Sequence, residues 1–152
     1  MAHLIDTGVL LRFVDDGDAL HPLVQQAVES LVRQREELFA ATQNIGEFWN
    51  VATRPVANNG WGLPPAEAFR LNENGIEPIC GIVPDVAATF TELKRLLTKY
   101  NVVGKQVHDA RLMALMLTRQ IDTILSLNAR DFQRYLPEGI SIVTPSDLVT
   151  TN

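Results

Sequence analysis

The feature that most constrains the fold is a regular alternation of short apolar runs with longer segments of helical periodicity. Apolar runs that predict strands occupy residues 3–5, 38–41, 123–127 and 140–143. Segments with one apolar face, which predict helices, occupy residues 19–35, 44–53, 65–73, 85–99 and 107–120. Strands that alternate with helices are typical of α/β proteins. We therefore predict a mostly parallel sheet with helices on both faces.

Length and composition fit one domain spanning residues 1–152. The chain has 152 residues, of which 46% are hydrophobic, and no repeat or linker divides it, so a disordered chain is excluded. No apolar run approaches the roughly 20 residues that a membrane span needs, and no signal segment opens the chain. The single cysteine, Cys80, can form neither an internal disulfide nor a cysteine-based zinc site. We expect a soluble cytoplasmic protein that does not bind membranes.

Two acidic residues stand where the pattern expects apolar ones. Asp6 directly follows the first predicted strand, and ligands of parallel sheets bind outside the carboxyl ends of the strands. A helix cap or a turn is the alternative for this residue. Glu47 borders the apolar face of its predicted helix, because Val51 lies one turn further along. Its alternative is a partly solvated surface charge.

The second half of the chain adds further polar groups of the same kind. Asp109 heads the inward stripe of its predicted helix, with Leu112 and Met113 one turn later. It also lies in the first turn, where the helix dipole stabilises a carboxylate without any other function. Asn128 and Asp131 follow the strand at 123–127, where turn and N-cap roles are the alternative.

Together these residues predict a site for a hard cation. Carboxylates gathered at one end of a parallel sheet repel one another unless a cation is present, and ligation by oxygen alone suits Mg²⁺ or Mn²⁺. Such a site can activate a water and offset charge on a phosphodiester during hydrolysis. We expect no His, Ser or Cys nucleophile beside the cluster, and we expect His108 to lie at the surface, because neighbouring helical residues point about 100° apart.

Four segments resemble the acidic motifs of PIN-domain ribonucleases, over residues 3 to 147. They are Leu4-Ile5-Asp6-Thr7, Asn44-Ile45-Gly46-Glu47-Phe48, Val107-His108-Asp109-Ala110 and Leu127-Asn128-Ala129-Arg130-Asp131-Phe132. Residues 47–62 are also similar to one group of VapC-type toxins from bacterial toxin–antitoxin pairs. The resemblance implies a PIN-like three-layer α/β/α sandwich around the mostly parallel sheet.

The resemblance also implies a function, that of a Mg²⁺- or Mn²⁺-dependent endoribonuclease inhibited by a cognate antitoxin. It further implies a homodimer. Asp6, Glu47 and Asp109 match the carboxylates that hold the metal in the family. Thr7 matches a small hydroxyl residue that assists near the metal. Members of the family often have a fourth acid in the last motif. Asn128 stands at that position here, with Asp131 three residues later, so either could serve as a fourth site.

The net charge of −5 conceals an uneven distribution that matters for RNA. Residues 94–134 contain eight basic and three acidic side chains, and they flank Asp109 on both sides. Arg12, Arg111 and Arg130 are candidates for contacts with RNA phosphates, and the alternative for each is an ordinary surface charge.

Three other functions remain open on the sequence. One is a PIN-like binding or assembly module with little or no activity, because the fourth acid is not clear. Another is a solitary RNA-processing nuclease without an antitoxin. A third is a phosphomonoesterase with Asp6 as nucleophile, which usually needs an aspartate two residues later, where this chain has Gly8.

Overall fold

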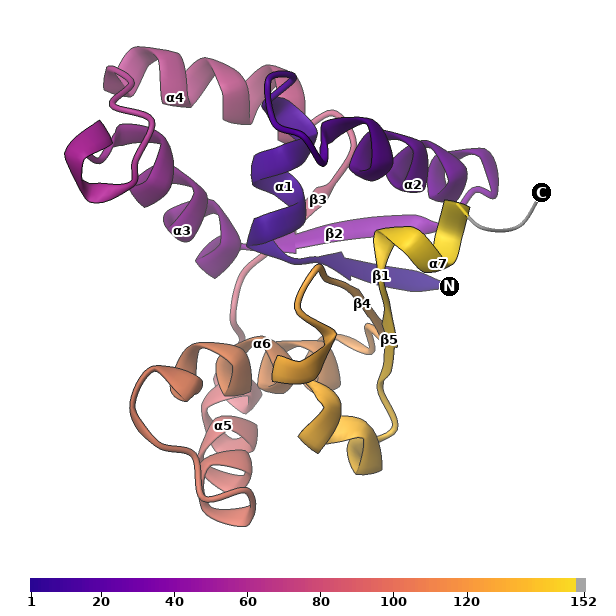
Figure 1. Cartoon of the computed structure of the whole chain (residues 1–152). Coiled ribbons are helices and arrows are strands. Elements are labelled where there is room, and N and C mark those ends of the chain that lie inside the picture. Colours follow the sequence, from indigo (N-terminus) through magenta and orange to yellow (C-terminus); the bar gives the residue numbers. More distant parts are fainter. Residues whose placement is uncertain (150–152) are drawn as a thin grey trace.

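Five parallel strands form the centre of the computed structural model, which describes residues 1–149 (Figure 1). The strands are β1 (Ala2–Ile5), β2 (Glu37–Ala41), β3 (Gly81–Val83), β4 (Thr123–Leu125) and β5 (Ser141–Val143). Their order is β3-β2-β1-β4-β5, and every neighbouring pair runs parallel. The sheet is thus wholly parallel, where the sequence predicted a mostly parallel one. The first strand lies at its centre.

Helices cover both faces of this sheet, which confirms the predicted three layers. One layer, uppermost in Figure 1, contains α1 (Thr7–Val14), α2 (His21–Arg33), α3 (Thr42–Thr53), α4 (Pro65–Leu71) and α7 (Pro145–Val149). The opposite layer contains α5 (Ala87–Lys99) and α6 (Val107–Arg119). Within residues 1–149, no helix is both long and apolar enough to cross a membrane.

Short helical turns complete the connections between these elements. A π-helical turn, η2 (Asn72–Ile76), follows α4. The 3₁₀ turns are η1 (Val56–Asn58), η3 (Gly104–Gln106), η4 (Ala129–Asp131) and η5 (Gln133–Glu138). The last two turns lie between β4 and β5, in the same layer as α5 and α6 (Figure 1).

Two buried apolar clusters, one on each face, hold the layers to the sheet. Successive strand residues point to opposite faces, and the central strand follows this rule. Leu4 packs with Met113 and Leu115 of α6, while Ile5 packs with the α1–α3 side. Both strand residues are fully buried. The central strand is therefore the element that both clusters share.

Most predicted elements are present with small shifts of their ends. α3 begins at Thr42 rather than Asn44, α5 begins at Ala87 rather than Asp85, and α6 ends one residue early, at Arg119. Three elements were not predicted: α1, β3 and α7. The last residues of the predicted domain, 150–152, lie outside the described residues.

Candidate functional site

Asp6 lies at the point where the central strand ends and α1 begins. It is the N-cap of α1, and its Oδ1 accepts a hydrogen bond of 2.9 Å from the Thr7 backbone N–H. Its Oδ2 accepts a bond of 2.8 Å from the hydroxyl of Ser126, just beyond the neighbouring strand β4. Burial raises the pKa of Asp6, and the two hydrogen bonds oppose that effect. Asp6 is thus a helix cap that also stands at the carboxyl edge of the sheet.

Glu47 projects from α3 and is held at both carboxylate oxygens. The Thr7 hydroxyl donates to its Oε2 at 2.8 Å, and Gln43 Nε2 donates to its Oε1 at 2.7 Å. The fully buried Asn44 donates from Nδ2 to the Thr7 oxygen at 3.0 Å, and its Oδ1 accepts from the Ala41 N–H at 2.9 Å. This chain of bonds fixes Glu47 relative to the end of the central strand.

Asp109 approaches the same region from the opposite layer, in the first turn of α6. Its pKa is raised to about 7, first by burial and then by the negative charges of Asp131, Asp6 and Glu47. The four carboxylates are therefore close enough for their charges to interact. Within residues 1–149, none of the four forms an ion pair with a basic side chain.

The two residues considered for a fourth site differ in their surroundings. The charge of Asp131, in η4, raises the pKa of both Asp6 and Asp109. Asn128 uses its backbone N–H to donate to the Ser126 hydroxyl at 3.0 Å, and its side chain is exposed. Both residues are exposed, so it is the interaction of its charge with Asp6 and Asp109 that favours Asp131 as the fourth polar group.

The donor set suits a hard cation, although it does not form a closed cage. In the part of the chain that the structure describes, no three His, Cys, Asp or Glu side chains lie close enough together to enclose an ion as they stand. All four acids nevertheless offer oxygen, and their charges are unneutralised at a partly buried position. Oxygen ligands and uncompensated negative charge fit Mg²⁺ or Mn²⁺, which retain several water ligands.

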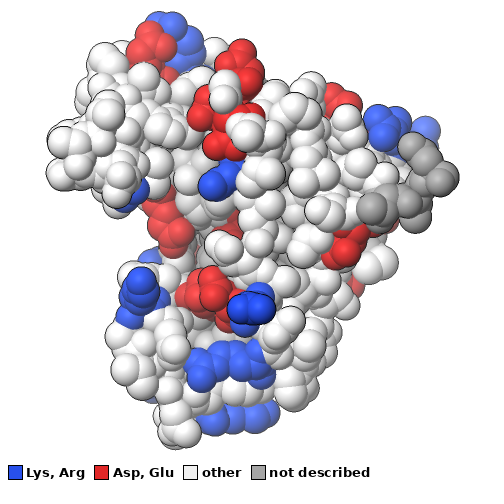
Figure 2. Space-filling model, in the orientation of Figure 1, with Lys and Arg blue, Asp and Glu red and all other residues white. Residues whose placement is uncertain are grey.

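An open recess of about 670 Å³ gives solvent access to two of the carboxylates. Its lining residues come from α3 and α6: Thr42, Gln43, Gly46, Glu47, Asn50, His108, Asp109 and Arg111. Figure 2 shows acidic side chains inside the hollow between the two helical layers, with basic side chains on the lower layer beside it. Gln43 spans this hollow, because its Nε2 also donates to the His108 carbonyl at 2.9 Å. The side chain of His108 is exposed, as predicted.

The three arginine candidates lie in different places. Arg111 lines the recess and forms an ion pair of 3.0 Å with Asp85. Arg130 lines a second pocket that shares Asp109 with the recess. Arg12 is in the upper layer, where it donates to the Gly8 carbonyl at 3.1 Å and lines a pocket away from Glu47 and Asp109. The structure thus brings two of the three toward the carboxylates.

Sequence reasoning missed the residues that hold the acids in place. It excluded a serine nucleophile beside the carboxylates and did not consider a serine that positions one of them, as Ser126 does by bonding directly to Asp6. Ser126 is fully buried, so it positions the carboxylate rather than reaching a substrate. Asn44 and Gln43 were also not singled out. The available signal was polarity at buried positions: Asn44 in the first turn of a helix, and Ser126 directly after an apolar strand.

Comparison with known proteins agrees with the resemblance seen in the motifs. Residues 3–135 match the PIN domain family. No curated protein matches the chain significantly. Among solved structures, the fold is similar to that of FitAB bound to an IR36 DNA fragment (15% identity, TM-score 0.70, covering 99% of both chains).

Two further structures extend the likeness. VapBC-1 from nontypeable Haemophilus influenzae has 12% identity and a TM-score of 0.68, over 96% of this chain and 99% of that one. The sarcin-ricin loop cleaving toxin VapC20 from Mycobacterium tuberculosis has 14% identity and a TM-score of 0.60, over 91% and 96%. These similarities concern the fold, whereas the family match spans most of the sequence. The chain belongs to the PIN domain family.

Proposed function

We propose that the protein is a metal-dependent endoribonuclease and the toxin of a toxin–antitoxin pair. The observation that carries this proposal is the convergence of four carboxylates, from four segments of the chain, on one partly buried site without a basic partner. Members of the PIN domain family are nucleases. A protein of similar fold, VapC20, is a toxin that cleaves the sarcin-ricin loop, an RNA element, which supports RNA as the substrate class.

We assign Asp6, Glu47 and Asp109 as the residues that hold Mg²⁺ or Mn²⁺, with Asp131 as the fourth acid. The ion would lower the pKa of a bound water and offset charge on the scissile phosphate. Thr7 is a positioning residue, because its hydroxyl holds Glu47 in place. Ser126 does the same for Asp6.

Arg111 is the basic residue best placed to meet a phosphate within the recess. It lines the recess together with Glu47 and Asp109, and its present partner, Asp85, is a half-exposed surface acid. An ion pair between such exposed groups is weak, so exchange of Asp85 for an RNA phosphate costs little. We expect Arg111 to orient the phosphate rather than to transfer a proton, since a guanidinium does not deprotonate near neutral pH.

The test is cleavage of RNA by the purified chain in Mg²⁺, with EDTA as the metal-free arm. We expect wild-type protein to cleave, and Asp6→Asn and Asp109→Asn each to lose at least about a hundredfold in rate. Asp16→Asn is the matched control, because Asp16 is an exposed acid on the loop after α1, away from the recess. Equal cleavage by all four proteins would show a contaminating nuclease and refute the proposal. So would the absence of Mg²⁺-dependent cleavage by wild type.

We propose a cognate antitoxin as the protein partner, and a homodimer as the state of the free chain. The similar structures include proteins crystallised as VapBC and FitAB. Co-expression with the product of a neighbouring small gene should give a complex that elutes as one species and no longer cleaves RNA. Light scattering of the free protein measures the oligomeric state. A monomer would refute the dimer without affecting the nuclease assignment.

A further inference from the structure

A second pocket, of about 230 Å³, adjoins the recess. Its lining residues are Gln106, Asp109, Arg130, Asp131, Arg134 and Tyr135. Asp109 lines both hollows, so the two are contiguous at one carboxylate. The second pocket belongs wholly to the lower layer, because its residues come from η3, α6, η4 and η5. A strand of substrate bound in the recess can therefore extend past Asp109 into the second pocket.

The two arginines of this pocket are available for a ligand. No carboxylate of residues 1–149 lies within ion-pair distance of Arg130 or Arg134, although Asp131 is adjacent in sequence. The one hydrogen bond that engages the Arg134 side chain runs from Nη1 to Gln106 Oε1, at 3.2 Å. This bond orients one edge of the guanidinium, whose Cζ lies 5.9 Å from the centroid of the Tyr135 ring, and no carboxylate of residues 1–149 engages its remaining N–H groups. Both arginines are exposed, so an anion can reach them.

The pocket contains a buried hydroxyl whose proton has no acceptor. Tyr135 is 1% exposed; burial raises its pKa, whereas the neighbouring Arg134 lowers it, and no group among residues 1–149 accepts its hydroxyl proton. A buried hydroxyl proton normally finds an acceptor, so this one is left for a ligand. Its neighbours Arg134 and Gln106 make the pocket rich in hydrogen-bond donors. A ligand that accepts hydrogen bonds and carries negative charge fits these donors.

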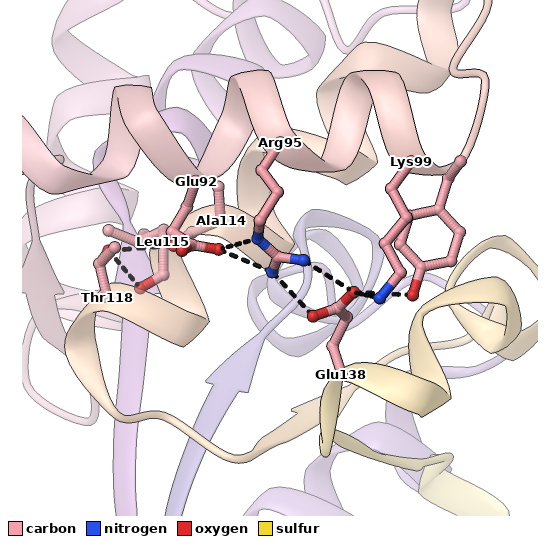
Figure 3. A network of polar contacts seen from close by, with 8 residues as sticks. Glu92, Arg95, Lys99, Ala114, Leu115, Thr118 and Glu138 are labelled. Carbon is pink, nitrogen blue, oxygen red and sulfur yellow. Dashed lines mark hydrogen bonds and ion pairs between the residues drawn. The ribbon is translucent and has the colours of Figure 1, made fainter.

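Tyr135 packs against Tyr100, which belongs to a network of ion pairs and hydrogen bonds around Glu138. Figure 3 shows Arg95 and Lys99 of α5 pointing toward Glu138 at the end of η5. Arg95 Nη2 lies 2.7 Å from a Glu138 oxygen, and Lys99 Nζ lies 2.9 Å from the other. Tyr100, which donates to Glu138 at 2.8 Å, packs edge-on against Tyr135 with ring centroids 4.9 Å apart. The wall of the pocket is thus fixed before any ligand arrives.

We propose that this pocket is a subsite for a non-scissile phosphate of the RNA strand, the neighbour of the phosphate that is cleaved. Arg130 and Arg134 donate to its oxygens, and the Tyr135 hydroxyl supplies a further donor. Phosphate only accepts hydrogen bonds, which is what two guanidinium groups and a hydroxyl require. This inference rests on the proposed nuclease function, because it adds a second phosphate contact beside the same site. The subsite would set the register of the backbone over the carboxylates without reading any base.

The first test uses inorganic phosphate as the probe and needs no catalysis. In ¹⁵N-labelled protein, the Nε–Hε signals of Arg130 and Arg134 should shift on titration with phosphate in EDTA. Arg134→Gln should weaken the apparent affinity about tenfold, and Tyr135→Phe about three- to tenfold, since each removes one class of donor. Lys94→Gln is the matched control: it removes one positive charge from α5, where Lys94 lies 4.7 Å from the Phe90 ring centroid. Wild-type signals that do not move would overturn the subsite.

The second test uses a fluorescein-labelled 12-nucleotide oligouridylate, whose binding is followed by anisotropy. All proteins carry Asp6→Asn so that the probe survives. The arginine variants should bind it about tenfold more weakly, and Lys94→Gln should stay within about twofold. Unchanged binding by Arg130→Gln and Arg134→Gln would overturn the subsite even if wild type cleaves RNA. Weakened binding without cleavage by wild type would instead refute the nuclease and leave a phosphate-binding pocket.

Discussion

The Asp109 carboxyl differs in its ionisation between the folded and the unfolded chain. In the folded protein its pKa is about 7, because burial and three nearby carboxylates disfavour its charge, whereas the usual value is 3.8. The folded state therefore holds this proton more tightly than the unfolded state. Stability from this source is complete below about pH 4 and is lost as the pH rises toward 7. Without a cation, the site destabilises the fold at neutral pH.

We predict that Asp109→Asn stabilises the metal-free protein at pH 8, because the amide cannot ionise. The full shift in pKa corresponds to at most about 4 kcal/mol, and partial exposure reduces the expected gain to about 1 to 3 kcal/mol. Urea unfolding in EDTA measures the free energy of unfolding of both proteins at pH 5 and pH 8. The gain should be larger at pH 8, and addition of Mg²⁺ should then stabilise wild type more than the variant. Parallel pH curves for the two proteins would contradict the prediction.

Replacement of Thr7 can separate the role of its hydroxyl from the role of its side-chain volume. Thr7→Val keeps the shape of the side chain but removes the donor to Glu47 and the acceptor for the buried Asn44. We expect a loss of about 1 to 3 kcal/mol in the free energy of unfolding, because the buried Asn44 Nδ2 is left without an acceptor. Loss of Glu47 orientation should reduce kcat about 10- to 100-fold. Thr7→Ser retains the hydroxyl and should stay close to wild type in both measurements; equal defects in the two variants would refute the hydroxyl's role.

At the scale of elements, the loop after α3 folds back and completes the end of that helix. The backbone N–H groups of Trp61 and Leu63 donate to the carbonyls of Val51 and Ala52, both at 2.9 Å. These bonds satisfy carbonyls that a helix end leaves without partners. The return requires Gly60, because a Cβ at that position would overlap the carbonyl of Arg54.

We predict that Gly60→Ala destabilises the protein by about 1 to 3 kcal/mol, because backbone must move to make room. Gly46→Ala is the matched control within α3. A Cβ there meets nothing within 4 Å, so alanine should stabilise the helix by about 0.5 to 1 kcal/mol. Thermal unfolding of the two variants should therefore change in opposite directions. A neutral effect of Gly60→Ala would show that the loop contributes little to the stability of α3.

The elements that sequence reasoning missed have a common physical cause. α1 contains Val9, Leu10, Leu11, Phe13 and Val14, and such a mixture of apolar residues without a polar face does not distinguish a helix from a buried strand. The Asp6 cap and packing against the sheet make this segment a helix. β3 and α7 are three and five residues long, too short for any periodicity to appear. The longer helices and the inner strands carried enough pattern to be predicted.

The same limit applies to the candidate site. Asp6, Glu47 and Asp109 could be singled out from the sequence because each is a charge at the end of an apolar strand, at the border of an apolar helix face or at the head of one. The choice between Asn128 and Asp131 depends on how a turn is oriented after β4, which spacing alone does not encode. Ser126 became visible as a partner of Asp6 only through the pairing of β1 with β4, since 120 residues separate the two side chains.

Over the whole molecule, carboxylates gather where the proposed cation would bind, and three arginines lie beside them. The net charge of −5 would by itself predict repulsion of RNA. In the structure, Arg111 lines the recess, while Arg130 and Arg134 line the adjoining pocket. On the proposed function, the attraction toward RNA is therefore local and involves few phosphates.

We predict a weak salt dependence of RNA binding that reflects this small number of contacts. Two neutralised phosphates on a single strand, one at Arg111 and one shared by Arg130 and Arg134, give a slope of about −1.4 for the logarithm of the binding constant against the logarithm of salt concentration. Anisotropy titrations of the Asp6→Asn protein with oligouridylate, at several NaCl concentrations, measure this slope. Arg134→Gln should make it shallower by about 0.7, whereas Lys94→Gln should not change it. A much steeper slope would mean that RNA covers a larger basic surface than the two pockets.

The position of β1 at the centre of the sheet has a consequence for the order of assembly during synthesis. The first strand emerges from the ribosome earliest, yet it gains its second neighbour only when β4 has been made. A nascent chain that stops before Thr123 lacks the Ser126 hydroxyl for Asp6 and the charge of Asp131. On the proposed function, the site of a nascent chain therefore stays incomplete until the segment after β4 has been made.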